Sequence, residues 1–173
     1  MLKSRERTFS GDHRESPPSP YSVEELTEQD REIDFECFRH AEAWQVGQRI
    51  VSTAYENAYP ITTAIWLGEQ RVFHAGLPGS TADNDQWAER KAALVRRYDA
   101  SSLLTARRLK AWGVEEESPR MGLDPRLHIL SGGGVPIRVR GSLVGVAVVS
   151  GLEEQADHDL VRDALRTQQK EIR

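Results

Sequence analysis

Apolar residues recur along the chain at two spacings, and each spacing predicts one kind of element. A helical spacing of about 3.6 residues predicts helices over 23–32, about 38–57, about 83–98, about 101–113, and from 157 onward. Runs rich in β-branched and aromatic residues predict strands over 61–67, 70–75, 135–139 and 143–149. The order is helix, helix, strand pair, helix, helix, strand pair, helix.

Short turns join the strands of each pair. Gly68-Glu69 places glycine first in a two-residue turn, as a β-hairpin favours, and Arg140-Gly141 joins the second pair. Two hairpins separated by helices predict an antiparallel α+β sheet flanked by helices, in one domain over 23–173, and not a βαβ repeat.

The strand over 143–149 is almost wholly apolar, so both of its faces are expected to be covered. Gly145 inside it predicts the close approach of another backbone or a large side chain. Few helices are available to cover this strand within one chain. We therefore expect the protein to form a homo-oligomer.

Residues 1–22 differ in composition from the remainder. They are rich in serine, proline and charge, and Ser16-Pro17-Pro18-Ser19-Pro20 cannot hold a helix because proline lacks the amide donor. Such a segment buries too little apolar area to offset its chain entropy. We predict a disordered tail that ends where Ser22 and Glu25 form a capping box.

Charge and composition exclude several classes of protein. The net charge is −4 and the basic residues are scattered, which argues against nucleic-acid binding. No apolar run approaches the roughly 18 to 20 residues of a membrane span, so we expect no membrane insertion. A single cysteine, Cys37, and a polar start without a signal-peptide pattern indicate a cytoplasmic protein.

No catalytic constellation emerges from the spacing of reactive residues, and we assign no catalytic residue. The five histidines lack metal-ligand spacing, and His74 and His128 are candidates only as lone ligands. Ser131 precedes three glycines but lacks the strand-turn-helix elbow of a serine hydrolase. The sequence predicts no metal site, and it favours a protein that is not an enzyme.

One polar cluster stands out between 83 and 91, and two interpretations remain open. The first is a capped helix with Trp87 in the core and charged residues in ordinary ion pairs. The second is a crevice that binds an anion such as a carboxylate or a haem propionate. Its lining would comprise Asn84, Trp87, Arg90, Lys91, Ser101, Ser102 and the backbone of Gly132, Gly133 and Gly134.

Two segments together resemble the GlcG/HbpS-like haem-degrading-domain family. The first runs from Gly132-Gly133-Gly134-Val135-Pro136-Ile137 through Gly141, Val144-Gly145 and Val149-Ser150-Gly151 to Asp157. The second comprises Leu77-Pro78-Gly79-Ser80-Thr81, Asp83-Asn84-Asp85, Trp87, Arg90-Lys91, Val95 and Ser101-Ser102. It is similar to a small subgroup containing a eukaryotic protein linked to the delivery of tail-anchored membrane proteins.

The resemblance implies a profilin-like fold, symmetric oligomers, and either of two functions. One is a non-catalytic module that engages protein partners, as in the delivery of tail-anchored proteins. The other is haem binding or haem degradation, with haem as the cofactor. No residue here matches a haem ligand of the family, so we expect any haem to be bound weakly or through a single histidine.

Overall fold

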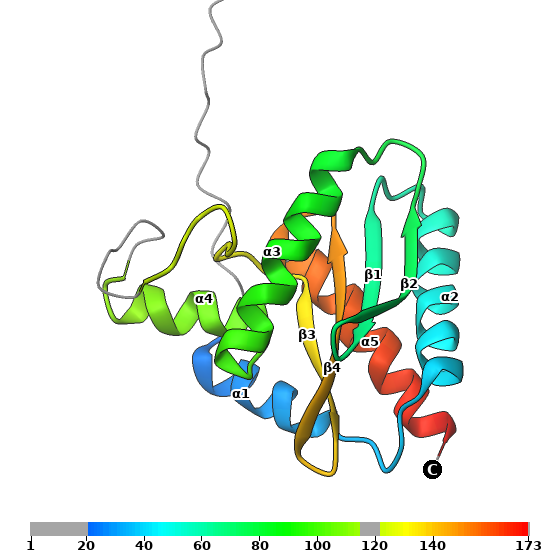
Figure 1. The fold of residues 1–173 in the computed structure, drawn as a ribbon, viewed down its shortest axis with the longest axis horizontal. Coiled ribbons are helices and arrows are strands. Elements are labelled where there is room, and N and C mark those ends of the chain that lie inside the picture. The colour runs from blue at the N-terminus through cyan, green and yellow to red at the C-terminus, as the bar shows by residue number, and fades with distance from the viewer. Residues whose placement is uncertain (1–20, 115–121, 173) are drawn as a thin grey trace, which may run out of the picture.

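The computed structural model describes residues 21–114 and 122–172 (Figure 1). Five helices and four strands lie in these ranges, in the order that the sequence predicts. The helices are α1 Val23–Glu32, α2 His40–Glu56, α3 Ala82–Tyr98, α4 Ser102–Ala111 and α5 Glu154–Glu171. The strands are β1 Thr62–Leu67, β2 Gln70–Gly76, β3 Gly134–Val139 and β4 Ser142–Ser150.

The four strands form one antiparallel sheet in the order β2-β1-β4-β3. Each predicted hairpin is a neighbouring pair, and β1 joins the two hairpins by pairing with β4. Arg140 and Gly141 both have positive φ angles, 51° and 79°, as in a type I′ turn. The α+β fold with a helix-flanked antiparallel sheet is therefore confirmed.

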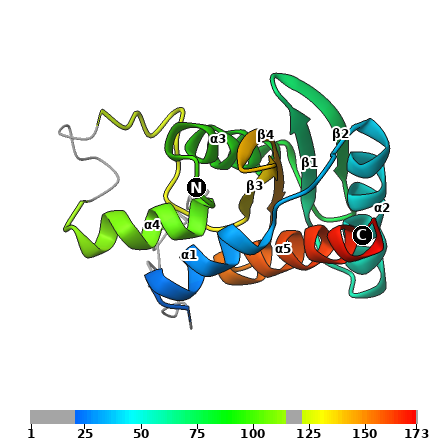
Figure 2. The same ribbon diagram turned by 90° about the horizontal axis from the view of Figure 1, so that it is seen from below.

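Helices cover both faces of the sheet (Figure 2). On one face, α2 and α5 enclose the larger core, which contains Ile65, Ala147 and Val149. On the other face, α3 packs on Ala64, Trp66, Val146 and Val148 through residues including Ala88 and Ala92. Alternate residues of β1 and β4 thus face opposite layers.

Because helices cover both faces of the sheet, the apolar strand β4 is not a reason to expect an oligomer. Positions 145–150 of β4 are buried within a single chain, because α3 covers one face and α5 the other. The apolar strand therefore requires no second subunit. Gly145 does mark a close approach, since a Cβ there would lie 3.1 Å from Leu67 Cδ2 and closer still to the Trp66 carbonyl.

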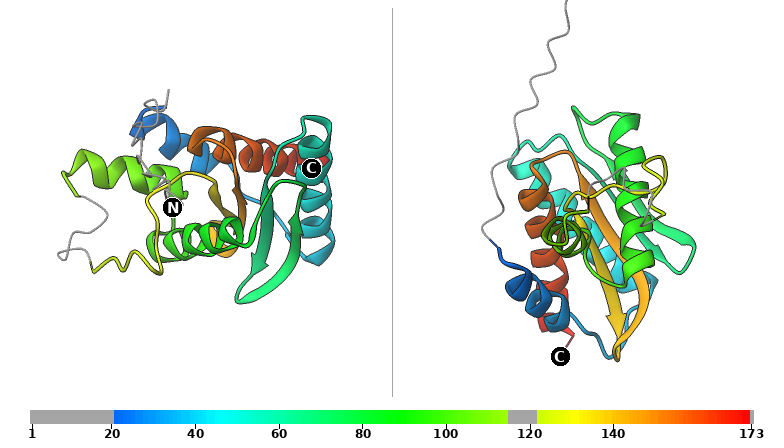
Figure 3. Two further views of the ribbon diagram at one scale, coloured as in Figure 1. Left: turned by 90° about the horizontal axis from the view of Figure 1, so that it is seen from above. Right: turned by 90° about the vertical axis from the view of Figure 1, so that its left-hand side faces the viewer.

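Helices α1 and α4 pack on each other beside the sheet (Figure 3). Their shared core contains Leu26, Leu103 and Leu104. The capping box is present, because Ser22 Oγ accepts from the Glu25 amide and Glu25 accepts from the Ser22 amide. The predicted tail lies outside the described residues except for Tyr21 and Ser22, and Tyr21 donates to Asp159.

Two local predictions were wrong. Helix α5 begins at Glu154, with Glu153 as its N-cap, and so starts one turn before position 157, where the sequence analysis placed its beginning. Trp87 is only half-buried, although the first interpretation of the cluster over 83–91 placed its ring in the core. The buried member of that helix face is Lys91, whose side chain is 2% exposed.

Candidate functional site

A buried ion pair lies between α3 and α5. Lys91 Nζ donates to Asp157 Oδ2 at 2.8 Å and to the Val149 carbonyl at 3.1 Å. Lys91 reaches this position because it shares a helix face with Ala88 and Val95, which pack on the sheet. The pair therefore connects α3, β4 and α5.

The carboxylate of Asp157 is held by backbone amides as well as by Lys91. Its Oδ1 accepts from the Leu152 amide at 3.0 Å, and its Oδ2 from the Gly151 amide at 3.3 Å. Burial lowers the pKa of Lys91, although Asp157 opposes this shift. Burial likewise raises the pKa of Asp157, and Lys91 and the two amides work against that rise. Both shifts arise because a charged group loses its hydration inside the protein.

A cavity of about 210 Å³ lies against this pair, and we call it the Lys91 cavity. Residues at the start of α3, the end of β4 and the segment before β3 form its wall. The lining comprises Asp83, Asn84, Trp87, Lys91, Ser131, Ser150, Gly151, Leu152 and Asp157.

The structure brings part of the predicted crevice together here. Asn84, Trp87 and Lys91 line the cavity from consecutive turns of α3. The glycine run lies directly behind it, since a Cβ on Gly133 would come within 2.9 Å of Lys91 Nζ. Gly133 has a φ of 114°, which side-chain-bearing residues rarely adopt.

The remaining predicted residues lie elsewhere. Ser102 supports the glycine run, because its Oγ accepts from the Gly134 amide at 2.9 Å. Ser101 caps α4 and donates its own amide to Asp30 at 2.6 Å, away from the cavity. Arg90 points to a different side of α3, because adjacent helical residues project about 100° apart.

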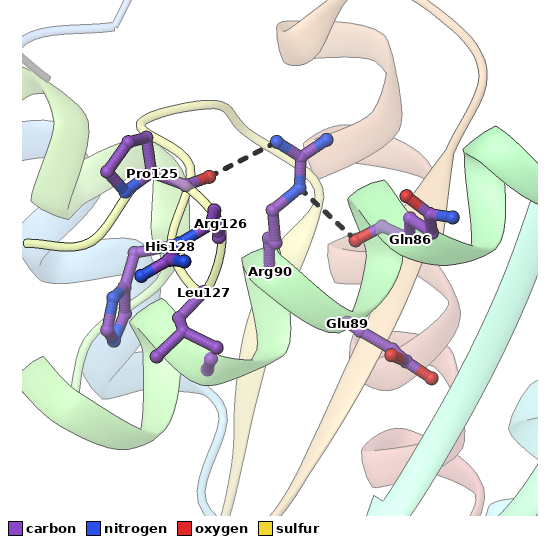
Figure 4. A pocket seen from close by; sticks show the side chains of 8 residues that line it. Gln86, Glu89, Arg90, Pro125, Arg126, Leu127 and His128 are labelled. Carbon is purple, nitrogen blue, oxygen red and sulfur yellow. Dashed lines mark hydrogen bonds between the residues drawn. The ribbon is translucent and has the colours of Figure 1, made fainter.

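Arg90 lines a second and larger pocket, which we call the Arg90 pocket (Figure 4). Its volume is about 800 Å³, and it lies between α3 and the segment over 125–128. The Arg90 guanidinium stacks 4.9 Å from the Trp87 ring and reaches the Pro125 carbonyl at 3.4 Å. The lining comprises Gln86, Glu89, Arg90, Ala93, Pro125, Arg126, Leu127 and His128.

Charge and unused hydrogen-bonding capacity distinguish the Arg90 pocket. Two arginines and one glutamate line it, but Arg126 pairs with Asp124 at 2.8 Å and Glu89 pairs with Arg71 at 2.6 Å, so Arg90 supplies the positive charge that has no ionic partner among the described residues. His128 Nδ1 is buried and has no hydrogen-bond partner in the part of the chain that is described. Leu127 is 59% exposed and supplies an apolar surface beside these polar groups.

Sequence reasoning missed Arg126 and the cavity role of Ser131, Ser150 and Asp157. The sequence did carry a signal that Arg90 and Lys91 line different cavities, because residues i and i+1 on a helix do not share a face. The other groupings depend on contacts between distant segments. Within 21–114 and 122–172, no cluster of three or more histidine, cysteine or acidic residues could hold a metal ion.

A family model described as "Haem degrading protein HbpS-like" matches residues 38–166. The chain belongs to the HbpS-like family. A UPF0303 protein of Streptomyces avermitilis is 43% identical over 148 residues, covering 84% of this chain and 90% of that protein. Another, from Streptomyces coelicolor, is 42% identical over 150 residues, covering 86% of this chain and 94% of that protein.

Two solved structures have a similar fold. The Ybr137w protein has a TM-score of 0.81 at 24% identity, covering 89% of this chain and 91% of that chain. The complex of PduOC with haem has a TM-score of 0.64 at 17% identity, covering 75% of this chain and 94% of that one. At these identities the likeness shows the fold alone. Among the described residues, no helix is long and apolar enough to cross a membrane.

Proposed function

We propose that this HbpS-like chain is a non-catalytic binding protein whose Arg90 pocket holds a flat, anionic ligand of the haem class. The observation that carries the proposal is one pocket of about 800 Å³ that combines cations, an apolar side chain and a histidine. Cofactor pockets in proteins span about 300–1,000 Å³ and carry few polar groups. The family description and the PduOC complex both name haem, which makes this ligand class the first to test.

The side chains that line the Arg90 pocket are of the chemical types that bind haem. Arg90 would pair with one propionate, since guanidinium groups match carboxylates in geometry. Arg126 would reach the other by exchanging its contact with Asp124. His128 lines the pocket, and its imidazole would supply the single nitrogen ligand to iron that the sequence leads us to expect. A bound iron porphyrin would supply redox chemistry of its own. Stacking on Trp87 orients Arg90 before any ligand arrives.

Haem titration of the purified chain tests this proposal. We expect a shifted Soret band, which His128→Ala removes and Arg90→Ala weakens about tenfold or more, because a charge-assisted hydrogen bond contributes about 1.5–3 kcal/mol. The matched controls are His40→Ala and Arg166→Ala, which lie on α2 and α5 behind the sheet. Equal haem binding by all four variants would contradict the proposal.

A second function is favoured by an aromatic surface on α2. Trp44 is 55% exposed and Tyr55 is 64% exposed, and they are three helical turns apart. Residues eleven positions apart lie about 20° apart around a helix, so both rings belong to one face. We propose that this face binds a second copy of the chain and makes the protein a homo-oligomer.

Light scattering at micromolar concentration measures this assembly. We expect the wild type to be an oligomer and the double variant Trp44→Ser/Tyr55→Ser to have a lower mass, because the apolar area is lost. Trp112→Ser is the control, since Trp112 is 69% exposed but ends α4 on another side. A monomeric wild type would rule out the interface.

The resemblance to the tail-anchored delivery subgroup supports a finer proposal. We infer that the oligomer works in the cytoplasm and engages protein partners, among them factors that deliver tail-anchored proteins. The fold likeness to Ybr137w is consistent with this reading. Affinity purification from native extract would test it, and recovery of no targeting factor or tail-anchored client would count against it.

A further inference from the structure

The Lys91 cavity is a distinct chemical environment from the Arg90 pocket, and its charge does not suit an anion. Asp157 neutralises Lys91 at 2.8 Å, and Asp83 adds a further negative group to the wall. An incoming carboxylate or phosphate would therefore meet no net positive charge. A neutral ligand with a polar oxygen is the better match.

The wall offers hydrogen-bond donors for such an oxygen. Lys91 Nζ has three donor positions, of which Val149 and Asp157 take two. Ser131 and Ser150 also line the cavity, and their hydroxyls have no hydrogen-bond partner within the described ranges. These donors surround a space of about 210 Å³. A water occupies about 30 Å³ of liquid, so the space would hold about seven waters or a ligand with about that number of non-hydrogen atoms.

The choice of lysine at the buried position is itself informative. The chain contains 19 arginines and only 4 lysines, at positions 3, 91, 110 and 170. Lys110 and Lys170 are exposed, whereas Lys91 is 2% exposed. Arginine stays protonated when buried, but a buried lysine can become a neutral, nucleophilic amine. Burial lowers the pKa of Lys91 in this direction.

We propose that the Lys91 cavity binds a small aldehyde or ketone and that Lys91 captures it reversibly as an imine. The reaction is independent of the Arg90 pocket and goes beyond the haem-class ligand proposed there.

The step is balanced without any oxidant or reductant. Within the pair, the proton of the Lys91 ammonium passes to the Asp157 carboxylate, which leaves a neutral amine and a carboxylic acid. The nitrogen lone pair forms a bond to the carbonyl carbon, and a proton moves from nitrogen to oxygen to give a carbinolamine. Asp157 then protonates the hydroxyl, which leaves as water as the C=N bond forms. The iminium proton returns to Asp157, and hydrolysis reverses each step.

Reductive trapping with propanal and sodium cyanoborohydride tests this proposal on the full chain. Peptide mapping by mass spectrometry then compares propylation at Lys91 with that at Lys110 and Lys170, two exposed internal references. At neutral pH we expect Lys91 to be labelled faster than either reference, because burial lowers its pKa and so favours the neutral, nucleophilic amine. A bulky aldehyde such as 2-naphthaldehyde should not show this preference, because the cavity excludes it.

Two variants separate a reactive site from a purely structural ion pair. Lys91→Arg keeps the positive charge but cannot form the imine, so no adduct should form at this position. Ser131→Leu leaves the pair intact and fills the cavity, so labelling of Lys91 should fall to the level of Lys110. Circular dichroism and thermal unfolding verify that each variant is folded. Labelling of wild-type Lys91 no faster than that of Lys110, or unchanged labelling in Ser131→Leu, would overturn the proposal.

Discussion

Asp157→Ala is expected to lower the free energy of unfolding by about 3–5 kcal/mol, as is typical when one member of a buried ion pair is removed. The variant leaves the Lys91 ammonium buried opposite an empty space. It also removes the acceptor for the amides of Gly151 and Leu152. Because the pair connects α3, β4 and α5, its loss affects both layers of the fold. Urea denaturation measures the change.

A double-mutant cycle measures the contribution of the Lys91–Asp157 interaction to stability apart from the other contacts of the two residues. Lys91→Met with Asp157→Leu should recover part of the loss, because apolar residues replace two buried charges. The recovery stays incomplete, since the two amides still lack their acceptor. Glu36→Gln is the control, as it alters an exposed pair with Arg140 and should change stability by less than about 1 kcal/mol. An effect of Asp157→Ala no larger than that of Glu36→Gln would contradict this account.

Acidification is expected to destabilise the fold through His158. This side chain is 1% exposed, and Gln29 Oε1 lies 3.2 Å from its Nε2. Its Nδ1 has no hydrogen-bond partner in the described part of the chain, so a second ring proton would be unpaired. Burial, together with the nearby charge of Arg162, lowers the pKa of His158 from 6.5 to about 3.

Acid destabilises the fold because His158 binds a proton more readily in the unfolded chain than in the folded chain. Below pH 6.5 the unfolded chain takes up a proton at His158, whereas the folded chain does not until about pH 3. Folding stability therefore falls by about 1.4 kcal/mol for each pH unit between these limits. The contribution of neutral His158 to the free energy of unfolding is therefore fully present above pH 6.5 and is lost as the pH falls.

Comparison with His158→Gln isolates this group. Asp30 and Asp157 have raised pKa values, chiefly through burial, so they favour the folded state as the pH falls and partly mask His158. The difference between the two proteins in urea unfolding removes these shared contributions. We expect the variant to lose less stability than the wild type between neutral and mildly acidic pH. Parallel pH profiles would show that His158 is not the acid-sensitive group.

The sequence by itself determined the elements and their order. Helical periodicity, the Ser22 capping box and the two glycine turns act over a few residues, so they can be recognised without knowing the fold. Gly145 was also informative, because only a close neighbour requires the absence of a side chain inside an apolar strand. The two quoted segments were sufficient to place the chain in its family.

The tertiary structure decided which elements meet, and with them the candidate sites. Trp87 and Lys91 are four residues apart and therefore share one face of α3, but only packing on the sheet made Lys91 the buried member. Asp157 was recognised as an acidic residue at a helix start, yet its partners come from α3 and from the segment before the helix. The covering of β4 by α3 and α5 likewise depends on residues far apart in sequence. Local patterns fix the direction of a side chain about its own helix or strand, whereas its partner is fixed only when distant segments pack.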